Sequence, residues 1–254
     1  MHRLLLASCI ALATLSGCAG TGGTASPDIA GALASPTRSA EDRERDALDK
    51  PAEVLALAGF ERGQTVADIL AGSGYYSEIL SGIVGPQGKV MLVNDTRYDA
   101  FGKDGYSKRL ANDRLPNVQH VAGPADALGM GESVLDGAVI VMSYHDLYWV
   151  DEKKPDQAKI DADWFLDQVA RALKPGGVLL VVDHSAKAGT GNSAAQDLHR
   201  IDEQFAIADF RKHGLALERD IAVLRNPDDD RSRNVFDPAI RGKTDRFVHL
   251  YRKQ

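Results

Sequence analysis

The amino-acid sequence predicts an α/β domain built on an open, mostly parallel β-sheet with helices on both faces. Short runs of apolar residues alternate along the chain with segments whose apolar residues recur at helical spacing. The short runs are apolar at nearly every position, which is typical of parallel strands buried on both faces. A turn with two glycines, Gly72-Ser73-Gly74, follows the first run and precedes the first helical pattern. The sequence therefore predicts a parallel sheet with a candidate ligand-binding turn after its first strand.

Seven segments are predicted to form the strands of this sheet. In chain order they are residues 66–70, 89–93, 118–122, 135–142, 178–182, 215–224 and 246–252. Helical patterns lie between several of the first five, including one that begins at Asp161 and ends before Pro175. A further helical pattern covers residues 196–213, but none lies between the last two strands. Those two strands are therefore predicted to pair as antiparallel neighbours at the edge of the sheet.

The N-terminal residues predict export. Arg3 precedes an uncharged apolar run from Leu4 to Leu15, which has the form of a signal peptide and is too short to span a bilayer. The quartet Leu15-Ser16-Gly17-Cys18 resembles a bacterial lipobox, which implies cleavage after residue 17 and a lipid anchor on Cys18. Ala19 resembles the outer-membrane signal of such lipoproteins, so the expected location is the periplasmic face of a bacterial membrane. The alternative is an ordinary secretory signal with an incidental cysteine.

Composition divides the rest of the chain into a tether and a domain. Residues 18–40 are rich in Gly, Ala, Ser, Thr and Pro and are predicted to be a flexible tether. Residues 41–254 then form one domain of ordinary size. The chain has two cysteines, and because Cys9 lies in the predicted signal peptide, no disulfide is expected. The formal net charge is -6 without any block of lysine or arginine, which argues against a nucleic acid as partner.

The glycine turn carries the main functional signal in the domain. Glycine permits positive φ and close approach of a ligand, and the start of a helix offers free N–H donors. Asp68 lies at the end of the preceding strand, and Asn94-Asp95 ends the next strand about 20 residues beyond Gly74. The carboxyl ends of neighbouring parallel strands meet at one edge of the sheet, so these polar side chains are expected near the turn. A purely structural turn is the alternative.

From about Glu41 onward, the sequence resembles the class I S-adenosylmethionine-dependent methyltransferases in its glycine turn and its polar strand ends. Within that superfamily it is most similar to a group of predicted, exported methyltransferase-like proteins of bacteria. The motifs behind this narrower resemblance are Ser143-Tyr144-His145-Asp146-Leu147, Val182-Asp183-His184, Leu198-His199-Arg200-Ile201-Asp202 and Gly242-Lys243-Thr244-Asp245-Arg246-Phe247. The resemblance implies a Rossmann-like, seven-stranded sheet with its last strand reversed, and S-adenosylmethionine as the cofactor.

The resemblance also implies roles for individual residues. Those implied to surround the cofactor are Asp68, Ala71, Gly72, Ser73, Gly74, Asn94, Asp95, Asp126 and Ser143. Ser143 and Tyr144 follow the fourth strand, where the methyl acceptor docks in this superfamily. The sequence departs from the superfamily pattern at Leu70, Asn94 and Pro124, which replace a glycine and two acidic residues. Because an amide accepts hydrogen bonds from ribose hydroxyls more weakly than a carboxylate does, cofactor binding is expected to be weakened or rearranged.

Methyl transfer from a sulfonium needs an acceptor in line with the methyl group and, for a neutral acceptor, a base. The candidate catalytic residues are His145, His184, Tyr144 and Asp146. Both histidines follow predicted strands and each has an aspartate beside it, but hydrogen bonding for structural reasons is the alternative for each. His199 stands three residues before Asp202 on a predicted helix and is expected to be structural.

Two other groups of polar residues have simpler interpretations. One group, which the fold could bring together as metal ligands, comprises His145, Asp146, Asp183, His184 and His199. These residues come from separate segments and lack any H-x-x-x-H or H-E-x-x-H spacing, so no metal is expected. The other group, Asp228-Asp229-Asp230, lies in a polar segment and is predicted to be a solvated turn, with a substrate lid as the alternative.

Three functions are compatible with the sequence. The first is an S-adenosylmethionine-dependent methyltransferase that acts on an unidentified small-molecule or envelope acceptor. The second is an accessory lipoprotein that binds an adenosyl ligand without the chemistry. The departures from the superfamily pattern favour this second function, as does the cytosolic origin of the cofactor. The third, a nicotinamide oxidoreductase, is supported by Asp95 but opposed by Ser77 at the third glycine position.

Overall fold

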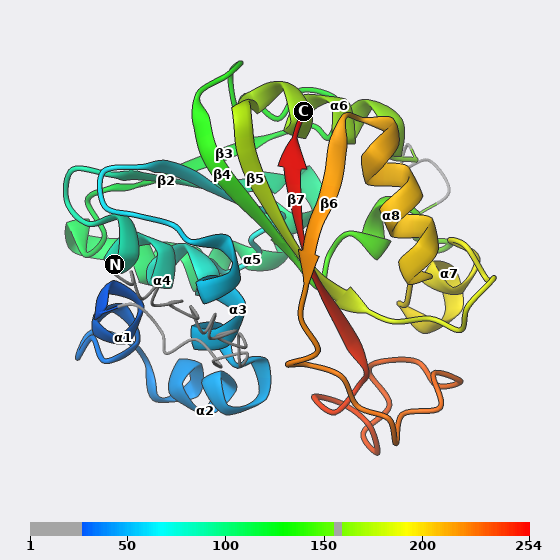
Figure 1. Ribbon diagram of the computed structural model, residues 1–254. Coiled ribbons are helices and arrows are strands. Elements are labelled where there is room, and N and C mark those ends of the chain that lie inside the picture. Colours follow the sequence, from blue (N-terminus) through cyan, green and yellow to red (C-terminus); the bar gives the residue numbers. More distant parts are fainter. Residues whose placement is uncertain (1–26, 155–158) are drawn as a thin grey trace, which may run out of the picture.

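The computed structural model of the protein describes residues 27–154 and 159–254 (Figure 1). The predicted signal peptide, Cys18 and Ala19 lie outside the described residues. The strands are β1 (Thr65–Ile69), β2 (Lys89–Asp95), β3 (Val118–Gly123), β4 (Leu135–Val141), β5 (Leu173–His184), β6 (Leu215–Asp220) and β7 (Arg246–Lys253). The helices are α1 (Pro27–Leu33), α2 (Ala40–Asp49), α3 (Pro51–Ala58), α4 (Tyr75–Val84), α5 (Thr96–Leu110), α6 (Ala162–Ala172), α7 (Ala194–Leu198) and α8 (Glu203–Lys212), with short 3-10 helices η1 (Ala111–Asp113) and η2 (His145–Leu147).

The strands form one seven-stranded sheet in the order β3-β2-β1-β4-β5-β7-β6. Strands β1 to β5 pair in parallel, whereas β7 is antiparallel to both β5 and β6. The antiparallel pairing of the last two strands is confirmed, and it follows from the absence of a helical crossover between them. The seven-stranded, mostly parallel sheet with a reversed last strand is therefore confirmed as well.

Side chains alternate between the two faces of the sheet and build two cores. Along β1, Ala67 and Ile69 join the core under α6 and α8, while Val66 joins the core under α1, α3 and α4. The two groups of helices lie on opposite sides of the sheet (Figure 1). Because the central strands are covered by helices on both faces, most of their residues are apolar, as the parallel-sheet prediction requires.

The prediction of a tether over residues 18–40 is wrong for residues 27–40. Ile29 and Ala32 of α1 are buried, and α1 packs against α4. The contact is close because Gly82 of α4 has no side chain: a Cβ there would lie 2.7 Å from the Cβ of Ala32. The small residues that suggested flexibility are thus used for tight helix packing, so the domain includes residues from 27 onward.

The helical pattern predicted over residues 196–213 is broken into α7 and α8. His199 ends α7 in the left-handed conformation, with φ 52, and Asp202 begins α8 by accepting a hydrogen bond from the backbone of Gln204. Arg200, between the helices, is fully buried. The break removes His199 from a helix surface and directs it toward the carboxyl edge of the sheet.

Helix α5 packs directly on the glycine turn. A Cβ on Gly102 would lie 2.2 Å from the carbonyl oxygen of Gly72, and a Cβ on Gly105 would lie 2.3 Å from the Cβ of Ser73. Only glycine, which has no Cβ, allows the backbone of α5 to come this close to the turn, so Gly102 and Gly105 set the position of α5.

Among the described residues, no helix combines the length and the apolar character needed to cross a bilayer.

We expect Gly102→Ala to lower the free energy of unfolding by about 1–3 kcal/mol, because the methyl group would meet main-chain atoms that cannot move aside. The matched control is Gly31→Ala in α1, where a Cβ meets nothing within 4 Å. Alanine there should stabilise the chain by up to about 1 kcal/mol through helix propensity. Urea unfolding of both variants measures the difference, and equal stability of the two would contradict the close packing of α5 on the turn.

Candidate functional site

The candidate site lies at the carboxyl ends of β1 and β4, which are neighbours in the sheet. Strands β2 and β3 lie on one side of β1, and β4 and the later strands lie on the other, so the strand order reverses between β1 and β4. Open α/β sheets bind ligands at such a switch point. The residues just beyond both strands, Leu70 and Met142, have φ of 53 and 54. Positive φ strains a residue with a side chain, and such strain concentrates at functional sites.

The glycine turn is held by Asn94 at the end of β2. The N–H of Gly72 donates to Asn94 Oδ1 at 2.9 Å, and Asn94 Nδ2 donates back to the Gly72 carbonyl at 3.1 Å. Asn94 is fully buried. The side chain that was expected to bind ribose therefore braces the turn, and the Gly72 N–H that was expected to be a free donor is already bonded.

The other cofactor residues implied by the resemblance differ in their surroundings. Asp95 caps α5 by accepting from the N–H of Tyr98 at 2.8 Å. Asp68 accepts from the hydroxyl of Ser77 at 2.7 Å, and its burial outweighs that bond and raises the pKa of Asp68 to about 6. Asp126 is exposed, and only its main-chain carbonyl is engaged, by the indole N–H of Trp164. Asp68 and Asp95 thus lie at the turn edge of the sheet with internal partners.

Two observations show that the turn fits an adenosyl ligand. A Cβ on Gly72 would meet only ring atoms of Phe101, at 3.8 Å, and Phe101 is 83 % exposed. In the direction in which a Gly72 side chain would point, the turn therefore faces one exposed aromatic side chain. Ser143, beyond β4, is 1 % exposed, and its hydroxyl has no hydrogen-bond partner within the described chain. A buried hydroxyl without a partner is costly unless a ligand or water completes it.

A second group of polar side chains lies beyond β4 and β5. The backbone N–H and the Nδ1 of His145 both bond to the Asp183 carboxylate, at 2.8 and 2.7 Å, and the N–H of His184 also donates to it, at 2.7 Å. Asp183 is fully buried. Burial disfavours the charged imidazole, but the carboxylates of Asp183 and Asp146 outweigh it and raise the pKa of His145 to about 9. Asp183 therefore fixes the ring of His145, whose Nε2 faces Asp146 Oδ1.

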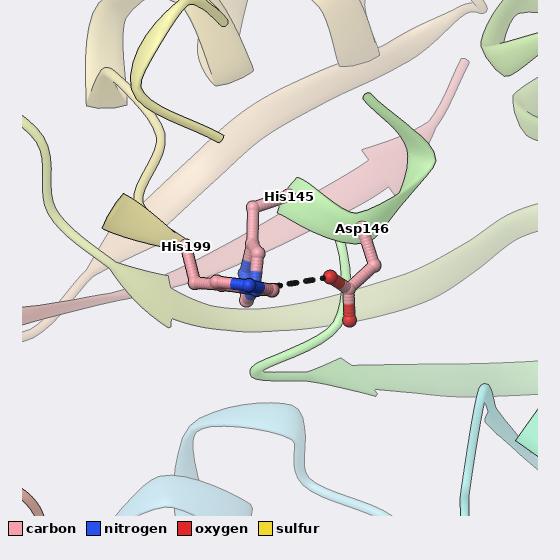
Figure 2. A group of neighbouring side chains, drawn as sticks. All are labelled: His145, Asp146 and His199. Atoms are coloured by element: carbon pink, nitrogen blue, oxygen red, sulfur yellow. Dashed lines mark ion pairs between the residues drawn. The ribbon is translucent and has the colours of Figure 1, made fainter. Parts of the chain in front are cut away.

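Asp146 joins this group to His199, which was expected from the sequence to be structural. Its Oδ1 lies 3.4 Å from His145 Nε2 and 3.4 Å from His199 Nδ1 (Figure 2). Its Oδ2 accepts from the Tyr98 hydroxyl at 2.5 Å. Burial opposes ionisation, but the two imidazoles and the hydroxyl lower the pKa of Asp146 to about 2. The expected structural pairing of His199 with Asp202 is wrong, because Asp202 caps α8 instead.

The remaining candidate catalytic residues have other partners. Burial first, and then the nearby charges of His145 and Arg246, hold the pKa of His184 well below its usual range, and its Nδ1 bonds to the Thr244 hydroxyl at 2.8 Å. Tyr144 is fully buried, and its hydroxyl donates to Asp209 of α8 at 2.6 Å. The structure therefore brings His145 and Asp146 together and leaves Tyr144 in the core under α8.

The position of His199 depends on the next residue, Arg200. The Arg200 guanidinium bonds to both oxygens of Asp229, at 2.8 and 3.1 Å, and donates to the carbonyls of Ser185 and Arg233. Asp229 is itself buried, so the prediction of a solvated turn at Asp228-Asp229-Asp230 is wrong for its central residue. Sequence pattern missed this anchor because the two partners are 29 residues apart.

We expect Asp229→Asn to lower the free energy of unfolding by about 3–5 kcal/mol, because it leaves the buried charge of Arg200 without its carboxylate. The matched control is Glu132→Gln, which breaks a pair with Arg171 that is exposed on both sides. That change should stay within about 0.5 kcal/mol of the unchanged protein. Chemical denaturation measures both, and a small effect of Asp229→Asn would show that Arg200 does not need this partner.

Comparison with known proteins matches the segment that contains the glycine turn and the polar group beyond β4. Residues 48–202 match the model of the ubiE/COQ5 methyltransferase family. A ubiquinone/menaquinone biosynthesis C-methyltransferase UbiE of Klebsiella pneumoniae is 32 % identical over 131 residues, which are 52 % of this chain and 47 % of that protein. The Escherichia coli K12 protein of the same name is 31 % identical over the same length and coverage. The matched region thus spans about half the length of these relatives.

Solved structures agree on the fold. A SAM-dependent methyltransferase from Aquifex aeolicus superposes with a TM-score of 0.58 at 18 % identity, over 84 % of this chain and 98 % of that one. A putative sarcosine dimethylglycine methyltransferase from Galdieria sulphuraria gives 0.55 at 16 % identity, over 84 % and 86 %. The sheet is therefore the Rossmann-like sheet of class I methyltransferases, whose cofactor is S-adenosylmethionine. With the family match over 48–202, which includes the glycine turn, the chain belongs to the ubiE/COQ5 methyltransferase family.

Proposed function

We propose that this protein is an S-adenosylmethionine-dependent methyltransferase. The observation that carries the proposal is the glycine turn at the switch point of the sheet, inside the segment that matches the family. Gly72 is open to a ligand, and Ser143, on the neighbouring strand end, offers a buried hydroxyl without a partner among the described residues. Phe101 beside the turn offers an aromatic face, against which a sulfonium cation or an adenine ring packs favourably.

The protein's own task in this reaction is positioning. The bound cofactor supplies a methyl group that its sulfonium charge has already activated, so the acceptor atom has only to be held in line with it. The strand ends of β4 and β5 support this, because His145 and Asp183 are fixed there by buried hydrogen bonds to each other. We propose that the acceptor, a small molecule or an envelope component, docks at this edge.

A second candidate function, binding of an adenosyl ligand without methyl transfer, is favoured by one specific contact. Asn94 is already bonded to the main chain of Gly72 at two atoms, which supports a protein that binds an adenosyl ligand without turning it over. The two candidates differ in turnover and share cofactor binding. Methyl transfer to water or to an added acceptor, followed as release of S-adenosylhomocysteine, separates them.

We expect the full chain to bind S-adenosylmethionine and S-adenosylhomocysteine with micromolar affinity in a calorimetric titration. Gly72→Val should weaken both at least about tenfold, or about 1.4 kcal/mol, because its side chain fills the open face of the turn. Gly59→Val is the matched control, since Gly59 also has positive φ, 65 against 55, and open space around it, but caps α3. Binding of NAD alone, or equal losses in both variants, would count against the proposal.

We also propose that the protein is an exported lipoprotein, anchored by Cys18 at the periplasmic face of a bacterial membrane, the outer membrane being favoured by Ala19. The lipobox-like quartet before Cys18 supports the proposal. Two or three acyl chains, at about 0.8 kcal/mol for each buried methylene, hold a protein on a bilayer permanently. The anchor would keep the domain at the membrane surface, where an envelope acceptor is within reach.

Cys18→Ser should abolish incorporation of labelled palmitate and move the protein from the membrane fraction to the soluble fraction. The control is Cys9→Ser, which changes the other cysteine and should leave labelling and fractionation unchanged because it lies before the expected cleavage point. Retention of label in Cys18→Ser would contradict the anchor.

A further inference from the structure

Two histidine side chains from separate segments converge on one oxygen of the Asp146 carboxylate. His145 and Asp146 come from η2, after β4, and His199 comes from the break between α7 and α8. Figure 2 shows the two imidazole rings and the Asp146 carboxylate turned toward one another. The ligand atoms of the three side chains all lie within 4.8 Å of one another. This His145–Asp146–His199 group lies at the same carboxyl edge of the sheet as the glycine turn but contains no residue of the turn.

The spacing within the group is too long for ordinary hydrogen bonds. Both imidazole nitrogens lie 3.4 Å from Asp146 Oδ1, whereas N–H···O bonds are about 2.7–3.2 Å long. His199 Nδ1 is buried and has no hydrogen-bond partner in the described chain. Ligand atoms at about 2.0–2.1 Å from a tetrahedral metal ion are about 3.3–3.4 Å apart, which matches the distance from each imidazole nitrogen to Asp146 Oδ1. We propose that His145, Asp146 and His199 bind a divalent transition-metal ion of the zinc class.

The surroundings orient two of the three ligands as metal sites require. His145 Nδ1 bonds to Asp183 at 2.7 Å, so Nε2 is the ring nitrogen that faces the group, and an ion that binds there replaces the proton on Nε2. A histidine held in this way by a buried carboxylate is the usual arrangement behind a metal ligand. The Tyr98 hydroxyl holds the far oxygen of Asp146 at 2.5 Å, so Oδ1 faces the two rings. His145 and Asp146 are therefore held in place by internal hydrogen bonds before any ion binds.

The donor set selects the class of ion. Two imidazoles and one carboxylate suit zinc or iron(II) and leave coordination positions open, whereas magnesium and calcium prefer sites made of oxygen. The side chains of Asp146 and His199 are 18 % and 16 % exposed, so an ion can enter from solvent on that side. The open positions would take water or an oxygen atom of a ligand.

Charge distinguishes this group from two others with similar spacing. The groups around His213 and His249 also bring two carboxylates near one histidine. In them a cation is already present, because Asp163 pairs with Lys212 at 2.5 Å and Glu203 pairs with Arg225 at 2.6 Å. Among the described residues, no lysine or arginine pairs with the Asp146 carboxylate. The His213 group therefore provides a natural control.

The test is a titration of the full chain, freed of metal with a chelator, with Co²⁺ and then with Zn²⁺. We expect one equivalent of Co²⁺ to produce visible absorption bands of a nitrogen and oxygen site, and Zn²⁺ to displace it. His199→Ala or Asp146→Asn should weaken Co²⁺ binding at least about tenfold, and Asp183→Asn about 10–100-fold through loss of the His145 orientation. His213→Ala should leave the titration unchanged.

Circular dichroism identifies variants that remain folded, and Asp146→Asn serves if His199→Ala does not fold. Absence of saturable Co²⁺ binding in the unchanged chain would overturn the proposal, as would full affinity in a folded His199→Ala or Asp146→Asn. Loss of binding in His213→Ala would place the ion at the other group and would equally overturn it. No adenosyl ligand is present in this titration, so its result is independent of the proposed methyltransferase function.

Discussion

The carboxyl edge of this sheet depends on one buried carboxylate, that of Asp183 at the end of β5. A fully buried carboxylate is stable only when hydrogen bonds replace its lost hydration, and Asp183 accepts them from His145 and His184. These bonds tie the segment after β4 to the segment after β5. The direction of η2, and with it the place of Asp146, follows from satisfying this single charge. The polar group beyond β4 is thus a consequence of fold stability as much as of any ligand.

Helix α5 connects the glycine turn with the polar group beyond β4. Asp95 ends β2 and caps α5, which places Tyr98 one turn into the helix. Tyr98 then donates to Asp146, so the helix that packs on the glycine turn also orients the carboxylate beyond β4. A shift of α5 would move both. Helix α5 therefore contacts both the glycine turn and the carboxylate of the proposed metal site.

The sequence predicted the sheet well because each strand's identity is a local property. Apolar runs marked the parallel strands, and the missing crossover marked the antiparallel pair. It failed where the structure depends on distant partners. The burial of Asp229 requires Arg200, and the packing of residues 27–33 requires Gly82, neither of which lies near in sequence. The convergence of His199 with His145 and Asp146 was named as an alternative and set aside, because a continuous helical pattern hid the left-handed conformation of His199 that ends α7.

Asn94 shows why a departure from a family pattern need not mean loss of a site. An amide can accept from the Gly72 N–H and donate to the Gly72 carbonyl at once, whereas an ionised carboxylate can only accept and would repel that carbonyl. Asn94 therefore holds the turn through both polar atoms of its side chain. A rigid turn loses less entropy when a ligand binds, which offsets part of the missing charge-assisted bond. The rest of the affinity has to come from the main chain of the turn and from groups such as Ser143, whose buried hydroxyl lacks a partner among the described residues.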